Sequence, residues 1–214
     1  MTRFAVIVAF LLLACMAADA TETAPETRMT DMNILTEADR KPETPTCQLA
    51  ADFSDPESLA PWRIVNDGVM GGQSQGARFH EDGAMVFAGT INTNGGGFSS
   101  LRAGLAPETL AGAQALRLRV RSDGRAYRMT FRTSERWRGR SVSYQASIPQ
   151  TPDGVWSDVT VPFDHMETSV FGRTVRADPF DPADAREMGI ILADGVDGPF
   201  RLEVASIACV PDQD

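Results

Sequence analysis

Residues 114–121 read Gln114-Ala115-Leu116-Arg117-Leu118-Arg119-Val120-Arg121. Apolar residues alternate strictly with arginines, which is the two-residue period of a β-strand with one buried face and one solvated face. Ser122-Asp123-Gly124-Arg125 follows, and its composition is that of a hairpin turn. Residues 127–132 then resume the alternation, with Tyr127, Met129 and Phe131 on one side. The pattern predicts two antiparallel strands joined by a turn.

Similar stretches occupy most of the chain beyond residue 49. Many short strands separated by turns are typical of an antiparallel β-sandwich or jelly roll. We therefore predict an all-β fold class of this kind. Further strands are expected at residues 142–148, 156–161, 188–192 and 200–204, and Asp-Gly or Asn-Gly turns begin at Asp82, Asn94, Asp153, Asp194 and Asp197.

The first 20 residues have the composition of an export signal. Arg3 precedes an apolar run over residues 4–14, which is too short to span a bilayer. Leu12-Leu13-Ala14-Cys15 resembles the lipobox of bacterial lipoproteins, in which the cysteine is acylated. Ala18-Asp19-Ala20 offers an alternative cleavage site that would release a soluble protein. We expect an exported, periplasmic protein, anchored to a membrane if Cys15 carries lipid.

Residues 21–46 are rich in Thr, Glu, Asp and Pro and hold few large apolar side chains. Such a segment cannot bury enough surface to offset the entropy lost on ordering, so it is predicted to be a flexible linker. The predicted organisation is a signal peptide over 1–20, this linker over 21–46 and a β-sandwich domain over 47–214.

Two cysteines, Cys47 and Cys209, flank the predicted domain. Sandwiches often bring their first and last strands together, and an oxidising compartment permits disulfides, so a bridge between the two is expected. The alternative is a pair of separate buried thiols.

The net charge of −9 argues against nucleic acid as a partner, because phosphate binding needs a basic surface. Residues 117–140 nevertheless hold nine of the 20 basic residues and only two acids, so that segment carries +7 and the remainder −16. The arginines either pair with acidic loops or form a docking face for an acidic protein or an anionic surface. Trp137 is either an exposed anchor in that face or a cap on the core edge. The candidate partner face consists of Arg117, Arg119, Arg128, Arg132, Trp137 and Arg138.

Residues 72–76 match the G-x-S-x-G pattern of serine hydrolases, with Ser74 at its centre. That motif needs a strand-to-helix turn and a nearby histidine, whereas a strand-like segment and an Asp-Gly turn follow here. A glycine-rich bend is the favoured interpretation. Asp178, Asp181 and Asp184 could hold calcium, but solvated turn acids are commoner. We predict no enzymatic activity, no metal and no cofactor.

Two blocks of residues resemble a known family. Trp62-Arg63-Ile64-Val65-Asn66-Asp67-Gly68-Val69-Met70-Gly71-Gly72-Gln73-Ser74 is similar to the signature of the complex I intermediate-associated protein family. A second block, from Gly89 to Arg102, matches as well, and the resemblance extends from about Ala51 to Cys209. The residues that carry it are Trp62, Asn66, Asp67, Gly68, Met70, Gly71, Gly72, Ser74, Gly96, Gly97, Phe98 and Arg102.

The resemblance implies a galactose-binding-like β-sandwich without established catalytic residues, whose best-known members hold intermediates of respiratory complex I assembly. The predicted function is therefore a non-enzymatic, chaperone-like module that binds an unidentified protein partner at the outer side of a bacterial membrane. The alternative is a carbohydrate-binding module, with Trp62, Trp137 or Tyr144 stacking on a glycan.

Overall fold

The computed structural model describes Cys47 and residues 50–212. The predicted signal peptide, its Cys15 and the linker lie outside these residues. Within them, no helix has the length and apolarity needed to cross a membrane.

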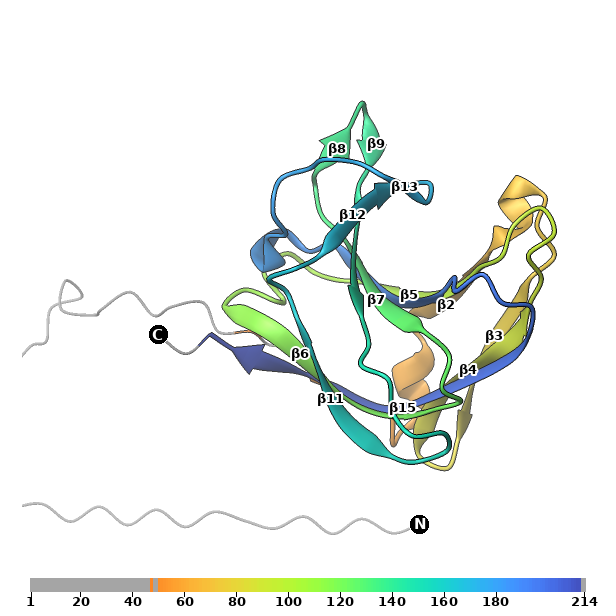
Figure 1. Ribbon diagram of the computed structural model, residues 1–214. Helices are drawn as coiled ribbons and strands as arrows, with labels where there is room; N and C mark the ends of the chain where they lie inside the picture. Colours follow the sequence, from red (N-terminus) through yellow and green to blue (C-terminus); the bar gives the residue numbers. More distant parts are fainter. Residues whose placement is uncertain (1–46, 48–49, 213–214) are drawn as a thin grey trace, which may run out of the picture. The chain divides into compact units, whose positions relative to one another are not determined.

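Two antiparallel sheets pack face to face (Figure 1). The first, called the β6 sheet, has the strand order β11-β6-β15-β4-β3, with β1 also paired to β15. Its strands are β1 (Ala50–Asp52), β3 (Gln75–Glu81), β4 (Ala84–Ile91), β6 (Ala113–Ser122), β11 (Ser157–Pro162) and β15 (Gly198–Pro211).

The second, called the β7 sheet, has the order β13-β12-β10-β7-β14-β5-β2. The hairpin β8 (Arg136–Trp137)–β9 (Arg140–Ser141) stands above it, and the short 3-10 helices are η2 (Pro56–Leu59), η3 (Asp67–Met70) and η4 (Pro182–Asp184). The strands of the β7 sheet are β2 (Trp62–Asn66), β5 (Ser99–Gly104), β7 (Tyr127–Arg132), β10 (Ser143–Ser147), β12 (Glu167–Val170), β13 (Arg173–Thr174) and β14 (Glu187–Leu192).

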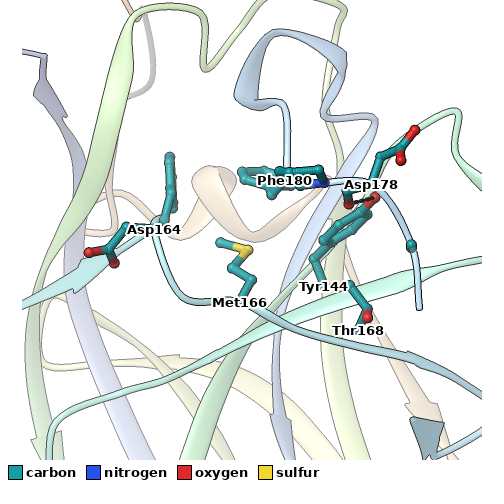
Figure 2. Close-up of a pocket in the computed structure, with 9 residues that line it drawn as sticks. Tyr144, Asp164, Met166, Thr168, Asp178 and Phe180 are labelled. Atoms are coloured by element: carbon teal, nitrogen blue, oxygen red, sulfur yellow. Dashed lines mark hydrogen bonds between the residues drawn. The ribbon is translucent and has the colours of Figure 1, made fainter. Parts of the chain in front are cut away.

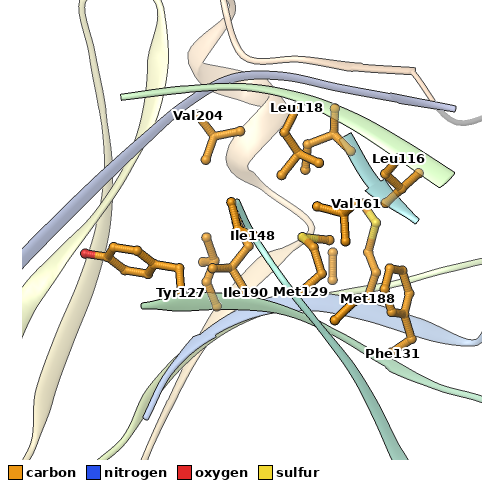
Figure 3. Packing of buried hydrophobic residues seen from close by; sticks show 14 of the residues in the cluster. Leu116, Leu118, Tyr127, Met129, Phe131, Ile148, Val161, Met188, Ile190 and Val204 are labelled. Carbon is orange, nitrogen blue, oxygen red and sulfur yellow. The ribbon is translucent and has the colours of Figure 1, made fainter. Parts of the chain in front are cut away.

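The apolar side chains of the alternating strands fill the space between the two sheets. Leu116 and Leu118 of β6 are fully buried, and so are Met129 and Phe131 of β7. Figure 3 shows these side chains meeting from opposite layers, with Ile190 of β14 beside them. The all-β sandwich prediction is confirmed, and each strand predicted by alternation forms a strand of the structure.

The predicted hairpin at residues 122–125 is wrong. β6 pairs with β11 and β15, whereas β7 pairs with β10 and β14, so the turn carries the chain from one sheet to the other. Its composition is that of a turn, as predicted. Side-chain contacts with β15 and with the β14–β15 turn hold this turn in the position that connects the two sheets. The Asp123 carboxylate accepts from the backbone N–H of Arg201, 2.6 Å away, and Arg125 contacts Asp194 at 2.6 Å.

The first and last strands lie together, as expected. β1 pairs with β15, with Ala50 opposite Ala208. A disulfide joins Cys47 to Cys209, with a Cα–Cα distance of 6.1 Å, which is within the usual range. The alternative of two separate thiols is therefore wrong.

Candidate functional site

A groove of about 410 Å³ lies on the outer face of the β7 sheet. One row of register partners crosses five adjacent strands of this sheet: Arg102, Gly189, Thr130, Gln145 and Glu167. All members except Gly189 line the groove. Strands lie about 4.8 Å apart, so the row extends for roughly 19 Å.

Gly189 is the one member of the row that does not line the groove. It has no side chain, and a Cβ at this position would overlap the carbonyl oxygen of Leu101 and crowd Arg102. The side chains beside it are hydrogen-bonding groups: Thr130 Oγ1 lies 2.9 Å from Ser143 Oγ, and the Gln145 amide reaches the same hydroxyl only at 3.5 Å. The polar positions of the alternating strands therefore form the floor of the groove.

Two phenylalanines line the edges of the groove. Phe98 follows the loop after β4, and Phe171 occupies the turn between β12 and β13. Figure 1 shows the β8–β9 and β12–β13 hairpins standing together above one side of the sheet. The Phe171 side chain is 72% exposed and lies 5.1 Å from the guanidinium of Arg140. An aromatic ring held open to solvent in this way is available for stacking.

Three arginines surround one carboxylate at the β5 side of the groove. Glu187 forms ion pairs with Arg63, with Arg102 at 3.6 Å and with Arg132 at 3.5 Å. Burial, together with the neighbouring charge of Arg132, lowers the pKa of Arg102 from its ordinary value. At the far side, Arg128 pairs with Glu167 at 2.6 Å.

The outer face of the β6 sheet has a different charge balance. Arg119 pairs with Asp158 at 2.8 Å, and Glu203 accepts from both Arg121 and Arg201. Arg201 also pairs with Glu81. In these ion pairs three arginines meet three carboxylates, whereas Arg117, on the same face of β6, forms no ion pair in the described part of the chain.

The prediction of one arginine-bearing partner face is wrong. Arg117 and Arg119 lie on β6, whereas Arg128 and Arg132 lie on β7. Because the two sheets turn their apolar sides toward each other, these pairs of arginines point to opposite sides of the sandwich. Most of them pair with acids of this chain, as the alternative interpretation expected, but these acids lie on strands of the same sheet and not in loops.

None of the three aromatic residues expected to stack on a glycan lies in the groove. Trp137 is half-buried against the core edge, with Arg138 stacked 4.6 Å from its ring centre. Trp62 is buried and packs edge to face on Phe53, and Tyr144 is buried in the interior.

Tyr144 instead lines a second cavity, of about 370 Å³, between β10 and the loop before η4 (Figure 2). Its hydroxyl donates to the carbonyl oxygen of Asp178 at 3.0 Å. Phe180 packs against Tyr144 and Phe131 and lines the same cavity. The loop is therefore fastened by packing and by a backbone contact.

Two of the three acids considered for calcium hold other contacts. Asp181 caps η4 by accepting from the backbone N–H of Ala183, and Asp184 accepts from Ser134 and Arg186. These hydrogen bonds lower the pKa of Asp184 to about 2. Among residues 50–212 and Cys47, no group of three or more His, Cys, Asp or Glu side chains is placed to hold a metal.

Asp67 is the centre of the signature block and is fully buried. Its carboxylate accepts from the backbone N–H groups of Ser74, Gly97 and Phe98 and from the Ser74 hydroxyl at 2.7 Å. Burial acts to raise the pKa of Asp67, but these hydrogen bonds together outweigh it and lower the pKa. A Cβ at Gly72 or at Gly96 would overlap the Asp67 carboxylate, so glycine is required at both.

Several of the remaining signature residues support this loop junction or line the groove. Asn66 accepts from Ser99 Oγ at 2.7 Å and from the N–H of Gly76. Gly71 has a φ of 87°, which favours glycine, whereas Gly68 has open space around it and Met70 ends η3. Phe98 and Arg102 alone among the signature residues line the groove.

Ser74 is placed as a structural residue. It is buried, and its hydroxyl is held by Asp67 and by the N–H of Asn92 at 3.1 Å. His80 contacts the carbonyl oxygen of Phe53 at 2.8 Å, and the His165 side chain is almost fully exposed beside Asp164. Neither histidine contacts Ser74, so the triad geometry of a serine hydrolase is not formed at this serine.

A family model, complex I intermediate-associated protein 30 (CIA30), matches residues 51–204. The chain belongs to this family. The resemblance carried by the signature block is thereby confirmed. No curated protein matches the chain.

This CIA30 family member also resembles solved carbohydrate-binding modules in fold. The family 11 module of the cellulosomal cellulase Lic26A-Cel5E from Clostridium thermocellum is 14% identical, with a TM-score of 0.53, over 72% of this chain and 90% of that chain. A family 11 module from the same organism, in complex with a β-1,3-1,4-mixed-linked tetrasaccharide, is 15% identical, with a TM-score of 0.51, over 72% and 91%. At this identity the likeness shows a shared sandwich fold.

Thr130, Gln145, Glu167 and Phe171 line the groove but were not predicted as site residues. The first three occupy solvent-facing positions on their strands, where any polar residue satisfies the alternation. These residues form one row because of the strand order in the sheet, and the alternation does not predict which strands are neighbours.

Proposed function

We propose that this CIA30 family member is a non-catalytic binding module that holds a glycan in the groove of the β7 sheet. The observation that carries the proposal is the row from Arg102 to Glu167, which crosses five strands and presents hydrogen-bonding side chains from four of them. Arginine, amide, hydroxyl and carboxylate groups donate to or accept from the hydroxyls of a sugar chain.

The groove has the mixed character of a small-molecule site. Its polar floor fixes orientation, and the exposed ring of Phe171 at the edge supplies an apolar surface for a sugar ring. A family 11 module of similar fold binds a tetrasaccharide, which is consistent with the proposal.

Affinity electrophoresis and calorimetry against a broad set of glycans test this function. Phe171→Ala is expected to weaken binding of the best glycan about tenfold, because stacking at a binding site contributes roughly 1 kcal/mol or more. Phe79→Ala is the matched control: Phe79 is a partly exposed phenylalanine beside Arg201, but it lies on the β6 sheet. If no glycan binds the wild-type protein, the proposal fails.

The second candidate is the assembly role, which the family match favours. Here the same surface would engage a protein partner, and co-purification from gently solubilised membranes would recover that partner in a stoichiometric amount. Charge reversal of Arg128, Arg132 and Arg138 is expected to release it. A partner captured in this way, together with no binding to any glycan, would favour assembly over the glycan.

We further propose that the protein is exported and lipid-anchored through Cys15. The Cys47–Cys209 disulfide supports export, because such bonds persist in oxidising compartments. Mass spectrometry of the mature N-terminus separates the alternatives: an acylated Cys15 supports the anchor, and a free Thr21 indicates a soluble periplasmic protein.

A further inference from the structure

We propose that the glycan held in the groove is acidic and that the arginines around Glu187 bind a carboxylate on its sugar rings. This inference rests on the proposed glycan-binding function. It adds the chemical class of the ligand and the residues that select it.

The first argument is the charge count on the outer face of the β7 sheet. Arg63, Arg102, Arg128 and Arg132 form ion pairs there with only two acids, Glu167 and Glu187. Two positive charges therefore remain uncompensated within these ion pairs. On the opposite face Arg119, Arg121 and Arg201 meet three carboxylates, and Arg117 forms no ion pair in the described part of the chain. That face therefore has one uncompensated arginine against two on the face that holds the groove.

The second argument is the number of unused hydrogen-bond donors. A guanidinium has five N–H donors and a carboxylate about four acceptor sites, so one glutamate cannot satisfy three arginines. Arg102 directs its Nε to Ser100 Oγ at 2.6 Å and forms the buried floor. The side chains of Arg132 and Arg63 are 40% and 55% exposed, so their remaining donors are open to solvent.

The third argument concerns the kind of anion. The cluster already holds one carboxylate, that of Glu187, and guanidinium groups match the planar geometry of that group. The middle of the row, Thr130 and Gln145, is uncharged and suits hydroxyl groups. A sugar chain that bears both hydroxyls and carboxylates matches the order of these side chains along the groove.

The charge at the groove also differs in sign from the net charge of the whole protein. The chain has a net charge of −9, which disfavours a polyanion at most of the surface. Arg140 adds positive charge at the edge of the groove, because its guanidinium lies 5.1 Å from the ring of Phe171, and it forms no ion pair with an acid in the described part of the chain. A local positive surface on an acidic domain directs an anionic ligand to this one place.

The test uses matched glycans: polygalacturonate, alginate and hyaluronan, each beside its carboxyl-reduced form, which keeps the linkages and hydroxyls. At least one acidic glycan is expected to bind about tenfold or more tightly than its reduced form, with an affinity that falls as salt rises. Arg132→Gln is expected to remove most of that preference, and Arg63→Gln, at an exposed position, supplies a second variant. Arg119→Gln, on the β6 sheet, is expected to leave the preference unchanged.

The possible outcomes distinguish a failure of the acidic-ligand inference from a failure of the proposed glycan-binding function. Equal binding of acidic and reduced glycans, or binding of neutral glycans only, overturns the acidic ligand and leaves glycan binding in place. Poly-L-glutamate that competes as well as the acidic glycan overturns it too, because charge alone would then explain the binding. Failure of every glycan, acidic and neutral, overturns the glycan function itself.

Discussion

At the scale of single residues, Asp67 connects three parts of the chain. It begins η3, and its carboxylate holds Ser74 before β3 and Gly97 and Phe98 before β5. The signature block therefore has mainly a structural role. It positions Phe98 at the edge of the groove, so its influence on binding is indirect.

Replacing Asp67 by Asn is expected to lower the free energy of unfolding by about 3 kcal/mol at neutral pH, because an amide NH₂ would face backbone N–H donors and a charged acceptor would be lost. Chemical denaturation measures this loss. A variant as stable as the wild type would show that the carboxylate is not needed.

The same residue predicts how stability depends on pH. Its pKa lies below the ordinary value of 3.8 in the folded protein, so its contribution is complete above pH 3.8 and is lost as the pH falls through the folded pKa. Asp184, with its pKa lowered to about 2, acts in the same direction. Unfolding free energies measured from pH 7 to pH 2 should fall below about pH 4, and less steeply in Asp67→Asn.

Two glycines of the signature provide a matched pair. Gly72→Ala is expected to cost more than about 2 kcal/mol, because its methyl group would overlap the Asp67 carboxylate. Gly68→Ala should change stability by less than about 1 kcal/mol, since nothing lies within 4 Å of the added carbon. Thermal unfolding of both variants compares them directly, and equal losses would contradict the assigned role of Gly72.

The sequence indicated that these glycines shape tight turns, but it could not identify their neighbour. Asp67 reads as one more polar residue before a glycine, and only the fold places it beside Gly96, which is 29 positions later. Likewise Arg102 was identified through family resemblance, while its groove neighbours Gln145 and Glu167 come from strands that the alternation could not order.

At the scale of elements, the turn between β6 and β7 decides how the sheets are connected. Alternation predicted both strands, because inward side chains must be apolar. It could not predict their partners, because both a hairpin and a crossing between sheets satisfy the same pattern. The crossing is fastened by Arg125, which contacts Asp194 at 2.6 Å and the carbonyl oxygens of Gly198 and Pro199.

Arg125→Leu is therefore expected to destabilise the fold by about 3 kcal/mol, because it leaves the largely buried Asp194 charge without its ion-pair partner. The two side chains are only 12% and 10% exposed. Adding Asp194→Asn should recover part of the loss, which a double-mutant cycle measures. Arg119→Leu breaks the exposed pair with Asp158 and should cost less than about 1 kcal/mol. Similar losses for both arginines would contradict this account.

At the scale of the whole domain, β15 joins the parts of the β6 sheet. Its first half pairs with β4, its second half with β1, and β6 runs along the other side. The pairing of first and last strands brings Cys47 to Cys209, which a count of two flanking cysteines predicted correctly. The disulfide then closes a loop of 162 residues, which is nearly the entire domain.

Removing this bridge by Cys47→Ser/Cys209→Ser is expected to lower the free energy of unfolding by about 2–5 kcal/mol, since a long loop restricts the unfolded chain strongly. The fold should persist, because the core between the sheets does not depend on the sulfur atoms. Denaturation with and without dithiothreitol supplies the control: the reductant should destabilise the wild type toward the variant and leave the variant unchanged. Thiol labelling confirms that the reductant has opened the bridge in the wild type. If the denaturation midpoint of the reduced wild type is then unchanged, the strand pairing between β1 and β15 alone holds the ends of the domain together.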